Sequence, residues 1–374
     1  MTRVSSSRDA GVEQLTAAAF TVPTDAPEGD GTFTWDSTTL VLVQVTSGGV
    51  TGTGWTYAPA ATSAIVREAL EPVVLGRGAM DVGGCWSAMV QHVRNSGRHG
   101  LVGYAISAVD VALWDLKARL VGLPLHHLLG AVHAEVPVYG SGGFTTYDAQ
   151  QLSEQLTGWA VDQRIPRVKI KIGQSWGTCV TRDVERMRQA RAVIGDDVEL
   201  FVDANGAYGV AQAIRVMDEV ADLDVRWFEE PVSSDDLEGL AAVRRRVRPD
   251  VAAGEYVGDL YEARRLCASG AVDCLQLDVS RIGGITEWLR AAAIAAAHNL
   301  QVSGHCGPNL HAHVAAATPN LRHLEWFHDH ERIESMLFDG ALDPTGGIIT
   351  PRDDAIGNGL TFRPDVAEQY RVAG

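Results

Sequence analysis

Three acidic residues recur at a constant interval in the middle of the chain. Asp203, Glu229 and Glu255 each follow a short apolar run, and successive members of the set are 26 residues apart. A step of this length accommodates one strand, one helix and two short loops, which is the repeat of an α/β barrel. Carboxylates at the ends of consecutive parallel strands would converge at the barrel mouth, where they repel one another unless a cation lies between them. The interval therefore predicts a barrel with a divalent-metal site at its mouth.

The same alternation of strand and helix extends over residues 136–326. Short apolar runs indicate eight strands, at 136–139, 167–172, 199–203, 226–229, 251–254, 274–277, 301–304 and 323–326. Seven helical stretches separate them, near 148–163, 178–194, 210–221, 235–247, 259–269, 284–298 and 309–317. This pattern favours a closed parallel α/β barrel over an open sheet. After Glu325 the chain is expected to become irregular and to return to the N-terminal part.

The first 130 residues follow a different pattern. β-forming residues around turn signals predict a small antiparallel sheet within 13–58, and helical spacing predicts helices near 60–75, 80–95 and 103–121. The segment Thr21–Gly31 is rich in Pro, Asp and Gly, which indicates a mobile loop. Residues 1–12 are polar and expected to be loose. An α+β unit is therefore predicted ahead of the barrel.

Composition restricts the partners and the compartment. The net charge of −16 argues against nucleic acid or an anionic membrane as a partner, and an anionic substrate would need a locally positive site. The five cysteines show no C-x-x-C spacing, which suits reduced thiols. The N-terminus lacks the apolar run of a signal peptide, and Ala291–Ala297 is too short to span a bilayer. A cytoplasmic enzyme is the expectation.

Two lysines supply positive charge on the strand before the acidic set. Lys169 and Lys171 are two residues apart, so on a strand their side chains share a face. A lysine inside a barrel is costly unless it has a partner or a function, so an inward pair would be functional. A lysine beside another cation loses its proton more easily and can act as a base. In the alternative, the lysines face outward and Val168, Ile170 and Ile172 face inward.

The acidic set offers only oxygen ligands. With no His or Cys nearby, Asp203, Glu229 and Glu255 favour Mg²⁺, or Mn²⁺ as a substitute, over Zn²⁺. Taken singly, Asp203 could cap a helix and Glu229 could be an ion-pair partner, but three acidic residues at the same strand position are harder to attribute to chance. Asn205 is expected either to support the metal or to form the turn. Glu230 is expected to point away from Glu229.

A second group of polar residues lies at the ends of the later strands. Asp278 and His305 are 27 residues apart, and a carboxylate that hydrogen-bonds an imidazole orients the ring and raises its pKa, which gives a usable base or acid. Glu325 closes the eighth strand and could donate to a developing oxyanion if protonated, or only hold the strand end. His311 and His313 are interpreted as residues of the following helix that lie on different faces.

These residues resemble the enolase superfamily and, within it, the mandelate racemase subgroup. The resemblance covers nearly the whole chain and rests on Lys-x-Lys at 169–171, the acidic set, Asp278, His305, Glu325 and the segment Ser107–Gly130. It implies Mg²⁺ and a (β/α)₇β modified TIM barrel with an α+β N-terminal capping domain. The expected limits are 1–130 for the capping domain, 131–330 for the barrel and 331–374 for a tail that returns to the capping domain.

The resemblance also implies removal of the proton α to a carboxylate, through an enediolate. Lys171 resembles the base on one face of the substrate, and Lys169 the group that binds the carboxylate and lowers the pKa of Lys171. His305, paired with Asp278, resembles the base or acid on the opposite face. Glu325 resembles the donor to the enediolate. The enediolate carries extra negative charge, and Mg²⁺ and cationic side chains fixed beside it would stabilise that charge. The residues present therefore suit this reaction.

The reaction class stays open at this stage. The subgroup contains many acid-sugar dehydratases, and the polar segments Thr21–Asp36 and Gly52–Pro59 suit a hydroxylated substrate, so dehydration of a sugar acid by a homo-oligomeric enzyme is the favoured prediction. Racemisation or epimerisation of a 2-hydroxy acid, and cycloisomerisation of a sugar acid or lactone, are the alternatives. A non-catalytic binding barrel and a metal-dependent hydrolase are more distant ones.

Overall fold

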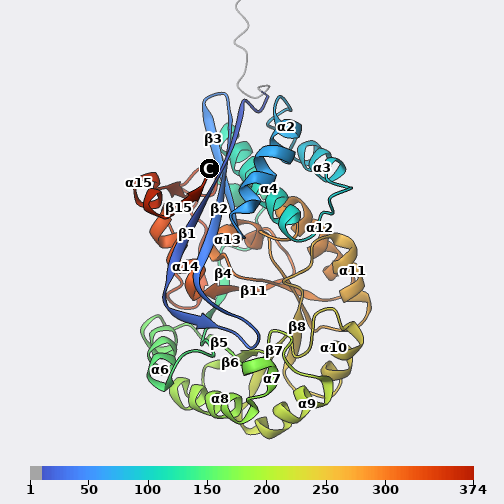
Figure 1. Ribbon diagram of the computed structural model, residues 1–374, viewed down its shortest axis with the longest axis vertical. Coiled ribbons are helices and arrows are strands. Elements are labelled where there is room, and N and C mark those ends of the chain that lie inside the picture. The colour runs from blue at the N-terminus through green and yellow to red at the C-terminus, as the bar shows by residue number, and fades with distance from the viewer. Residues whose placement is uncertain (1–10) are drawn as a thin grey trace, which may run out of the picture.

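The computed structural model describes residues 11–374, and in it eight parallel strands close into a barrel (Figure 1). The strands are β4 (Val136–Gly142), β5 (Arg167–Lys171), β6 (Glu199–Asp203), β7 (Val225–Glu229), β8 (Asp250–Ala253), β9 (Cys274–Leu277), β10 (Gln301–Gly304) and β11 (Leu321–Phe327). Neighbours in the barrel follow chain order, and β11 pairs with β4, with Glu325 opposite Tyr139. The predicted closed barrel is confirmed.

Helices follow the strands and cover the outside of the barrel (Figure 1). Their starts are encoded locally: Asp148 and Gln151 form a capping box, and Asp236 and Asp259 each accept from a backbone N–H of the first turn. The helices are α6 (Ala149–Thr157) with η3 (Gly158–Asp162), α7 (Gln174–Gly177), α8 (Val180–Ile194), α9 (Val210–Glu219) with η4 (Ala221–Leu223), α10 (Leu237–Arg244), α11 (Leu260–Ala268), α12 (Gly284–Ala297) and α13 (Pro308–Ala316). The sequence predicts all of them except the short α7.

Alternate residues of β5 face opposite sides of the barrel wall. Val168, Ile170 and Ile172 pack in the large apolar core that the strands share with the surrounding helices. Lys169 and Lys171 face the interior, where they contact carboxylates from other strands. The outward-facing alternative for the lysines is therefore wrong. Beneath them, the interior is filled by a mostly aromatic cluster of Tyr139, Phe201, Trp227, Ala252 and Cys274.

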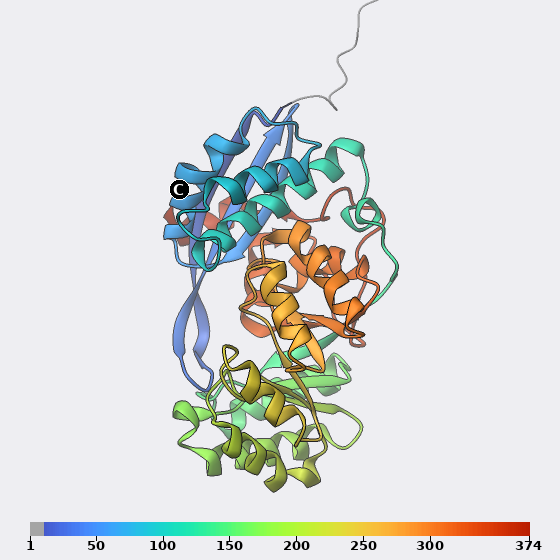
Figure 2. The ribbon, with the colours of Figure 1, turned by 90° about the vertical axis from the view of Figure 1, so that its right-hand side faces the viewer.

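The N-terminal part forms an antiparallel sheet backed by helices (Figure 2). The sheet order is β15-β1-β2-β3, with β1 (Gln14–Gly29), β2 (Thr34–Ser47), β3 (Val50–Tyr57) and β15 (Arg371–Ala373). The helices are α1 (Ala61–Ile65), η2 (Val66–Leu70), α2 (Glu71–Val74), α3 (Val82–His92), α4 (Leu101–Val121) and α5 (Leu125–Leu129). The α+β unit expected ahead of the barrel is confirmed.

The mobile loop predicted for Thr21–Gly31 is wrong. Strand β1 continues to Gly29, and its pairing with β2 is interrupted only between Pro23 and Glu28. Cross-strand pairing with a β-rich partner outweighs the local turn signals, and the unpaired residues form a bulge. The resulting hairpin reaches down to the barrel mouth (Figures 1 and 2), where the N–H of Thr145 donates to the carbonyl oxygen of Gly29 at 2.8 Å.

The tail differs from the irregular chain expected after Glu325. Strand β11 continues to Phe327, and α14 (His328–Leu337) begins directly after it. The remaining elements are short: β12 (Phe338–Asp339), β13 (Ile348–Ile349), β14 (Thr361–Phe362), α15 (Pro364–Ala367), η5 (Glu368–Tyr370) and β15. Strand β13 pairs with β4 and β15 pairs with β1, so the tail contacts both the barrel and the N-terminal sheet. The domain limits near residues 130 and 330 remain a proposal.

The loose segment predicted for 1–12 lies mostly outside the described residues, but Val12 is buried and its N–H donates to the carbonyl oxygen of Arg77 at 2.8 Å, so the expectation is wrong there. Within residues 11–374, no helix is long and apolar enough to cross a membrane. The cysteines are free thiols, as the spacing indicated.

Close packing of β3 on α4 depends on a glycine. A Cβ added at Gly54 would lie 2.4 Å from the carbonyl oxygen of Ala108 and 2.5 Å from the nitrogen of Ala112. We expect Gly54→Ala to lower the free energy of unfolding by about 1–3 kcal/mol, because the helix backbone must move away. Chemical denaturation measures this. In the control Gly83→Ala, the added carbon meets no described atom within 4 Å; equal losses in both variants would contradict the packing argument.

Candidate active site and metal centre

The acidic set predicted from the 26-residue interval comes together at the C-terminal ends of the barrel strands. Asp203 ends β6, Glu229 ends β7, and Glu255 follows β8 after Gly254. One carboxylate oxygen of each lies within 4.8 Å of the others, and all three side chains are buried. Buried carboxylates this close together repel strongly in a medium of low dielectric constant. The arrangement needs positive charge.

Two oxygens beside this set lack a hydrogen bond. Oε2 of Glu255 and Oε1 of Glu230 are buried and have no hydrogen-bond partner among residues 11–374; the Nε2 atom of His305 lies 3.4 Å from the former. A buried acceptor without a partner costs free energy. A divalent cation with a preference for oxygen, such as Mg²⁺, would satisfy both the repulsion and the unpaired oxygens. The residues therefore fit the predicted metal.

Glu230 directly follows β7 and is buried. Burial raises the pKa of its carboxyl well above the ordinary value, and the carboxylates of Glu255 and Asp203 raise it further. That its side chain points away from Glu229 stays a prediction. The φ of Glu230 is +37°, which ends the alternation of side chains along the strand. Asn205 and Cys306, which also follow site residues, have φ values of +45° and +51°. Such strained backbone collects at functional sites.

The lysines lie within the negative field of the carboxylates. Lys169 is fully buried, and its Nζ lies 2.5 Å from Oε1 of Glu229, 2.7 Å from Oε1 of Glu325 and 3.8 Å from Oδ2 of Asp203. Lys171 donates to Asp203. Burial lowers the pKa of each ammonium, but the nearby carboxylates outweigh it, and both pKa values are raised. A cation bound by the acidic set would compete with Lys171 for Asp203. It would thereby weaken the ion pair that keeps Lys171 protonated.

His305 faces the acidic set from another strand. Its Nδ1 lies 2.8 Å from Oδ2 of Asp278, and its Nε2 points toward Glu255. Burial lowers the pKa of the imidazole, but the carboxylate of Glu255 and the hydrogen bond to Asp278 outweigh it and raise the pKa above its ordinary value. Because Asp278 accepts a hydrogen bond from Nδ1, that nitrogen carries a proton, and Nε2 is left directed at the site. The two residues thus form the pair that the sequence predicted.

Glu325 accepts hydrogen bonds in this structure. Its carboxylate receives the hydroxyl of Ser141 at 2.6 Å and the backbone N–H of Cys306 at 2.9 Å. Burial raises its pKa, but Lys169 and then His305 outweigh burial, so the pKa lies well below the ordinary value. Glu325 is therefore ionised here. It could donate to an oxyanion only after Lys169 has been drawn to another anion and a proton has been gained.

His311 and His313 lie in the helix α13, as interpreted from the sequence, and both are buried. His311 has a local structural role: its Nε2 accepts the N–H of Val279 at 2.8 Å and its Nδ1 bonds to the carbonyl oxygen of Gly307 at 2.9 Å. His313 bonds to the carbonyl oxygen of Asn358. Neither ring adds a ligand to the acidic set.

Several residues that support the site were missed. Trp227 and Gln276 both donate to Oε2 of Glu229, at 2.8 and 3.0 Å. Each precedes a predicted site residue by two positions on its strand, so the two-residue period of a strand could have identified them. Arg281 forms ion pairs with Glu255 at 3.1 Å and Asp278 at 3.3 Å, but it lies in a loop, where no period applies.

Two family models match the chain. The N-terminal domain of mandelate racemase / muconate lactonizing enzyme matches residues 15–130, and the enolase C-terminal domain-like model matches residues 151–366. Among relatives, a 3,6-anhydro-alpha-L-galactonate cycloisomerase of Streptomyces coelicolor is 34% identical over 76% of this chain and 80% of its own length. An L-talarate/galactarate dehydratase of Salmonella typhimurium is 31% identical over 81% and 77%.

Solved structures agree with these matches. A mandelate racemase/muconate lactonizing enzyme-like protein from Rubrobacter xylanophilus is 48% identical with a TM-score of 0.94, over 97% of this chain and 100% of that one. A racemase from Streptomyces coelicolor with bound magnesium is 29% identical with a TM-score of 0.90, over 96% and 100%. Sequence, fold and relatives lead to the same assignment: the chain belongs to the enolase superfamily, among the proteins related to mandelate racemase and muconate lactonizing enzyme.

Proposed function

We propose that this protein is a Mg²⁺-dependent enzyme that removes the proton α to the carboxylate of a sugar acid and dehydrates it. One observation carries the proposal: the acidic set is contacted by Lys171 through Asp203 and by His305 through Glu255. A substrate carboxylate held there would have an ammonium group and an imidazole within reach on different sides. Relatives that are acid-sugar dehydratases support the choice of substrate class.

Asp203, Glu229 and Glu255 would hold the metal. Structures related to this chain contain magnesium, including an L-talarate/galactarate dehydratase with a bound hydroxamate. Bound here, Mg²⁺ would stabilise the negative charge that develops on the substrate carboxylate as the α-carbon loses its proton. The buried oxygen of Glu255 without a hydrogen-bond partner in the described chain supports this ligand set.

The lysines act on the carboxylate and the α-proton. Lys169 is buried among carboxylates and stays protonated, so its role is to bind a substrate carboxylate oxygen. The neutral amine of Lys171 would accept the α-proton; a metal held by Asp203 would weaken the ion pair that keeps Lys171 in its ammonium form. The electron pair of the broken C–H bond moves into the carboxylate, which gives an enediolate. Glu325 lies 2.7 Å from Lys169 and could take part in stabilising that charge if protonated.

His305 completes the reaction on the other side. In dehydration, the imidazolium gives its Nε2 proton to the β-hydroxyl, the C–O bond breaks, and water leaves as the enediolate electrons form the double bond. Asp278 keeps the ring oriented and stabilises its cationic form.

Cycloisomerisation is the second candidate, and two relatives favour it: the cycloisomerase of Streptomyces coelicolor and a D-galactarolactone cycloisomerase of Agrobacterium fabrum. In that reaction the same groups act, but the leaving oxygen stays attached to the carbon chain, so no water is released. Racemisation of a 2-hydroxy acid would need His305 to return the proton to the α-carbon instead.

The residues that would determine substrate specificity lie at the barrel mouth, where the hairpin of β1 and β2 covers it. The barrel residues Phe144, Tyr147, Cys306 and Phe327 pack in one cluster with Trp35 and Ala26 of the hairpin. Ring contacts fix this cover, with Trp35 and Phe144 edge to face at 5.6 Å between centroids. A homo-oligomer in the cytoplasm remains our prediction from the sequence.

A screen of sugar acids and lactones tests the function. We expect magnesium-dependent conversion of at least one sugar acid to a keto product that has lost one water, seen by NMR and mass spectrometry. A product of unchanged mass would replace dehydration with cycloisomerisation or epimerisation. The proposal fails if no compound reacts and if none exchanges its α-hydrogen in D₂O.

Variants on the two sides separate the roles of the bases. With the substrate found above, Lys171→Ala and His305→Asn should each lower turnover by about 10²–10⁴-fold, the range for loss of an acid or base. Lys171→Ala should also abolish exchange of the α-hydrogen in D₂O, whereas His305→Asn should retain it. Lys117→Ala and His298→Asn are the matched controls and should remain active. The reverse pattern of exchange would make His305 the base.

The ligand set is tested by metal binding alone. Glu229→Gln removes a charge from the acidic set while keeping nearly the same shape, so we expect the affinity for Mg²⁺ to fall at least tenfold, about 1.4 kcal/mol. Calorimetric titration of chelator-treated protein measures it. Asp235→Asn, on the loop before α10, is the control. Unchanged affinity in Glu229→Gln would remove this residue from the ligand set.

A further inference from the structure

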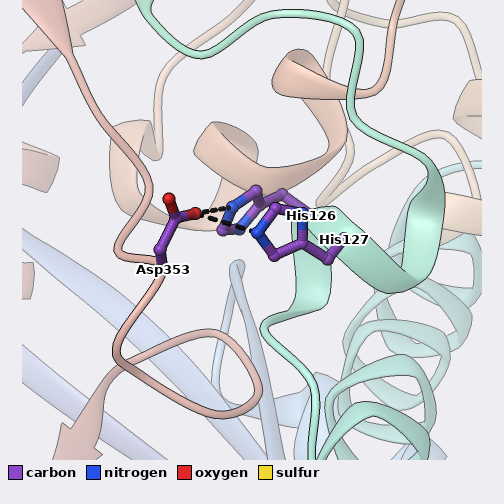
Figure 3. Close-up of side chains that lie close together, drawn as sticks. All are labelled: His126, His127 and Asp353. Atoms are coloured by element: carbon purple, nitrogen blue, oxygen red, sulfur yellow. Dashed lines mark hydrogen bonds and ion pairs between the residues drawn. The ribbon is translucent and has the colours of Figure 1, made fainter.

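A cluster of metal-binding side chains lies outside the active site. His126 and His127 are adjacent on α5, and Asp353 lies on the loop that follows β13. Figure 3 shows the two imidazole rings directed at the carboxylate of Asp353. The Nε2 atom of each ring lies 2.9 Å from the same Oδ1 atom. The proposed reaction uses none of these residues.

The backbone fixes both sides of the cluster. The N–H of Leu125, next to His126, donates to the carbonyl oxygen of Gly357 at 2.7 Å, and the N–H of Gly357 donates to the carbonyl oxygen of Leu123 at 3.0 Å. The loop with Asp353 is thus held between this point and the pairing of β13 with β4. The three ligand atoms are brought together by secondary structure, so little ordering is required for binding.

The nearest charged side chains do not compete with His126 and His127 for Asp353. The neighbouring Asp354 is engaged by Arg352, whose guanidinium donates to both of its carboxylate oxygens at 3.0 and 2.9 Å. His313 lies beside His126, with ring centroids 5.5 Å apart, and burial lowers its pKa to about 4, so this ring is neutral. Neither group opposes a cation between His126 and Asp353.

Two imidazole nitrogens and one carboxylate oxygen are the ligands of zinc rather than of magnesium. Zn²⁺ binds nitrogen and oxygen at about 2.0–2.2 Å and prefers four ligands, which places neighbouring ligand atoms about 3.3–3.5 Å apart. The present separations of 2.9 Å would need to open by a few tenths of an ångström. Asp353 and His127 are 79% and 49% exposed, so an outward motion meets solvent and water can supply the fourth ligand.

We propose that His126, His127 and Asp353 form a Zn²⁺ site that fastens the C-terminal tail to α5, the last helix of the N-terminal part. The ion binds Nε2 of both rings and Oδ1 of Asp353. Each ring then carries its proton on Nδ1. The site is distinct from the all-oxygen set in the barrel, which has a different metal preference.

The surroundings of His126 limit the affinity. Its Nδ1 is buried and has no hydrogen-bond partner within the described part of the chain. Ligand histidines usually donate from the second nitrogen, and loss of that bond weakens metal binding about 10- to 100-fold. Zinc should therefore bind reversibly and be removable by a chelator. Binding should raise the melting temperature, because the three ligands come together only when the tail is folded.

Calorimetric titration of the full chain with zinc chloride tests the proposal. The protein is treated with chelator and then kept in excess Mg²⁺, so that the acidic set in the barrel is filled. We expect one zinc site in the wild type, with an affinity at least tenfold weaker in His127→Ala and in Asp353→Asn. Asp354→Asn is the matched control and should bind like the wild type. Zinc should raise the melting temperature of the wild type and of the control alone.

Anomalous diffraction at the zinc edge gives the position independently. A peak bounded by His126, His127 and Asp353 supports the site. Equal zinc binding by the wild type, His127→Ala and Asp353→Asn, or a peak elsewhere with none here, overturns it; the three side chains then form hydrogen bonds only. Because His127 and Asp353 are exposed, we expect both variants to fold, and an unchanged melting temperature without zinc verifies this.

Discussion

Attraction between buried charges of opposite sign is the interaction on which the barrel mouth depends. Three cationic side chains and an imidazole share this interior with six carboxyl groups: Lys169, Lys171, Arg281 and His305 with Asp203, Glu229, Glu230, Glu255, Asp278 and Glu325. Removing each ion from water costs several kcal/mol, and the mutual attraction offsets this only where geometry is close and the remaining donors are paired. Lys169 forms close ion pairs with Glu229 and Glu325, so its charge is well compensated. Oε2 of Glu255 has no hydrogen-bond partner among the described residues, so its charge is not. The interior is therefore short of positive charge, and a metal would relieve this shortage.

The layer beneath the charges makes their attraction strong. Tyr139, Phe201 and Trp227 fill the barrel floor with rings, and His323 packs edge to face against Tyr139. Rings that exclude water lower the local dielectric constant, so each charge above them acts on its neighbours with less screening. Tyr139 also presents its face to the Nζ of Lys169 at 5.3 Å. The floor thus belongs to the chemistry of the site, although no ring is expected to touch the substrate.

Features that obey a strict period were predictable from the sequence, and features that break the period were not. The eight barrel strands, the acidic set and the pair Asp278–His305 were found because parallel strands end at one edge and recur at one interval. The positive φ of Glu230, which turns the chain out of the strand pattern, was not predictable because the residue types do not reveal it. The second half of β1, from Thr21 to Gly29, was mistaken for a loop because its stability comes from partners on β2 rather than from its own residues. Residue roles in the reaction are inferred from family resemblance and geometry, and they remain proposals.

The hairpin of β1 and β2 gives the cover of the site a constraint that a loop would lack. Side chains along a strand alternate between its faces, so the register Thr21–Thr39 to Pro23–Ser37 determines which residues beyond it look toward the barrel. An insertion of a single residue before the bulge would exchange the two faces, while an insertion of two would preserve them. The faces that this hairpin presents to the barrel are therefore kept only by insertions of an even number of residues along the ladder.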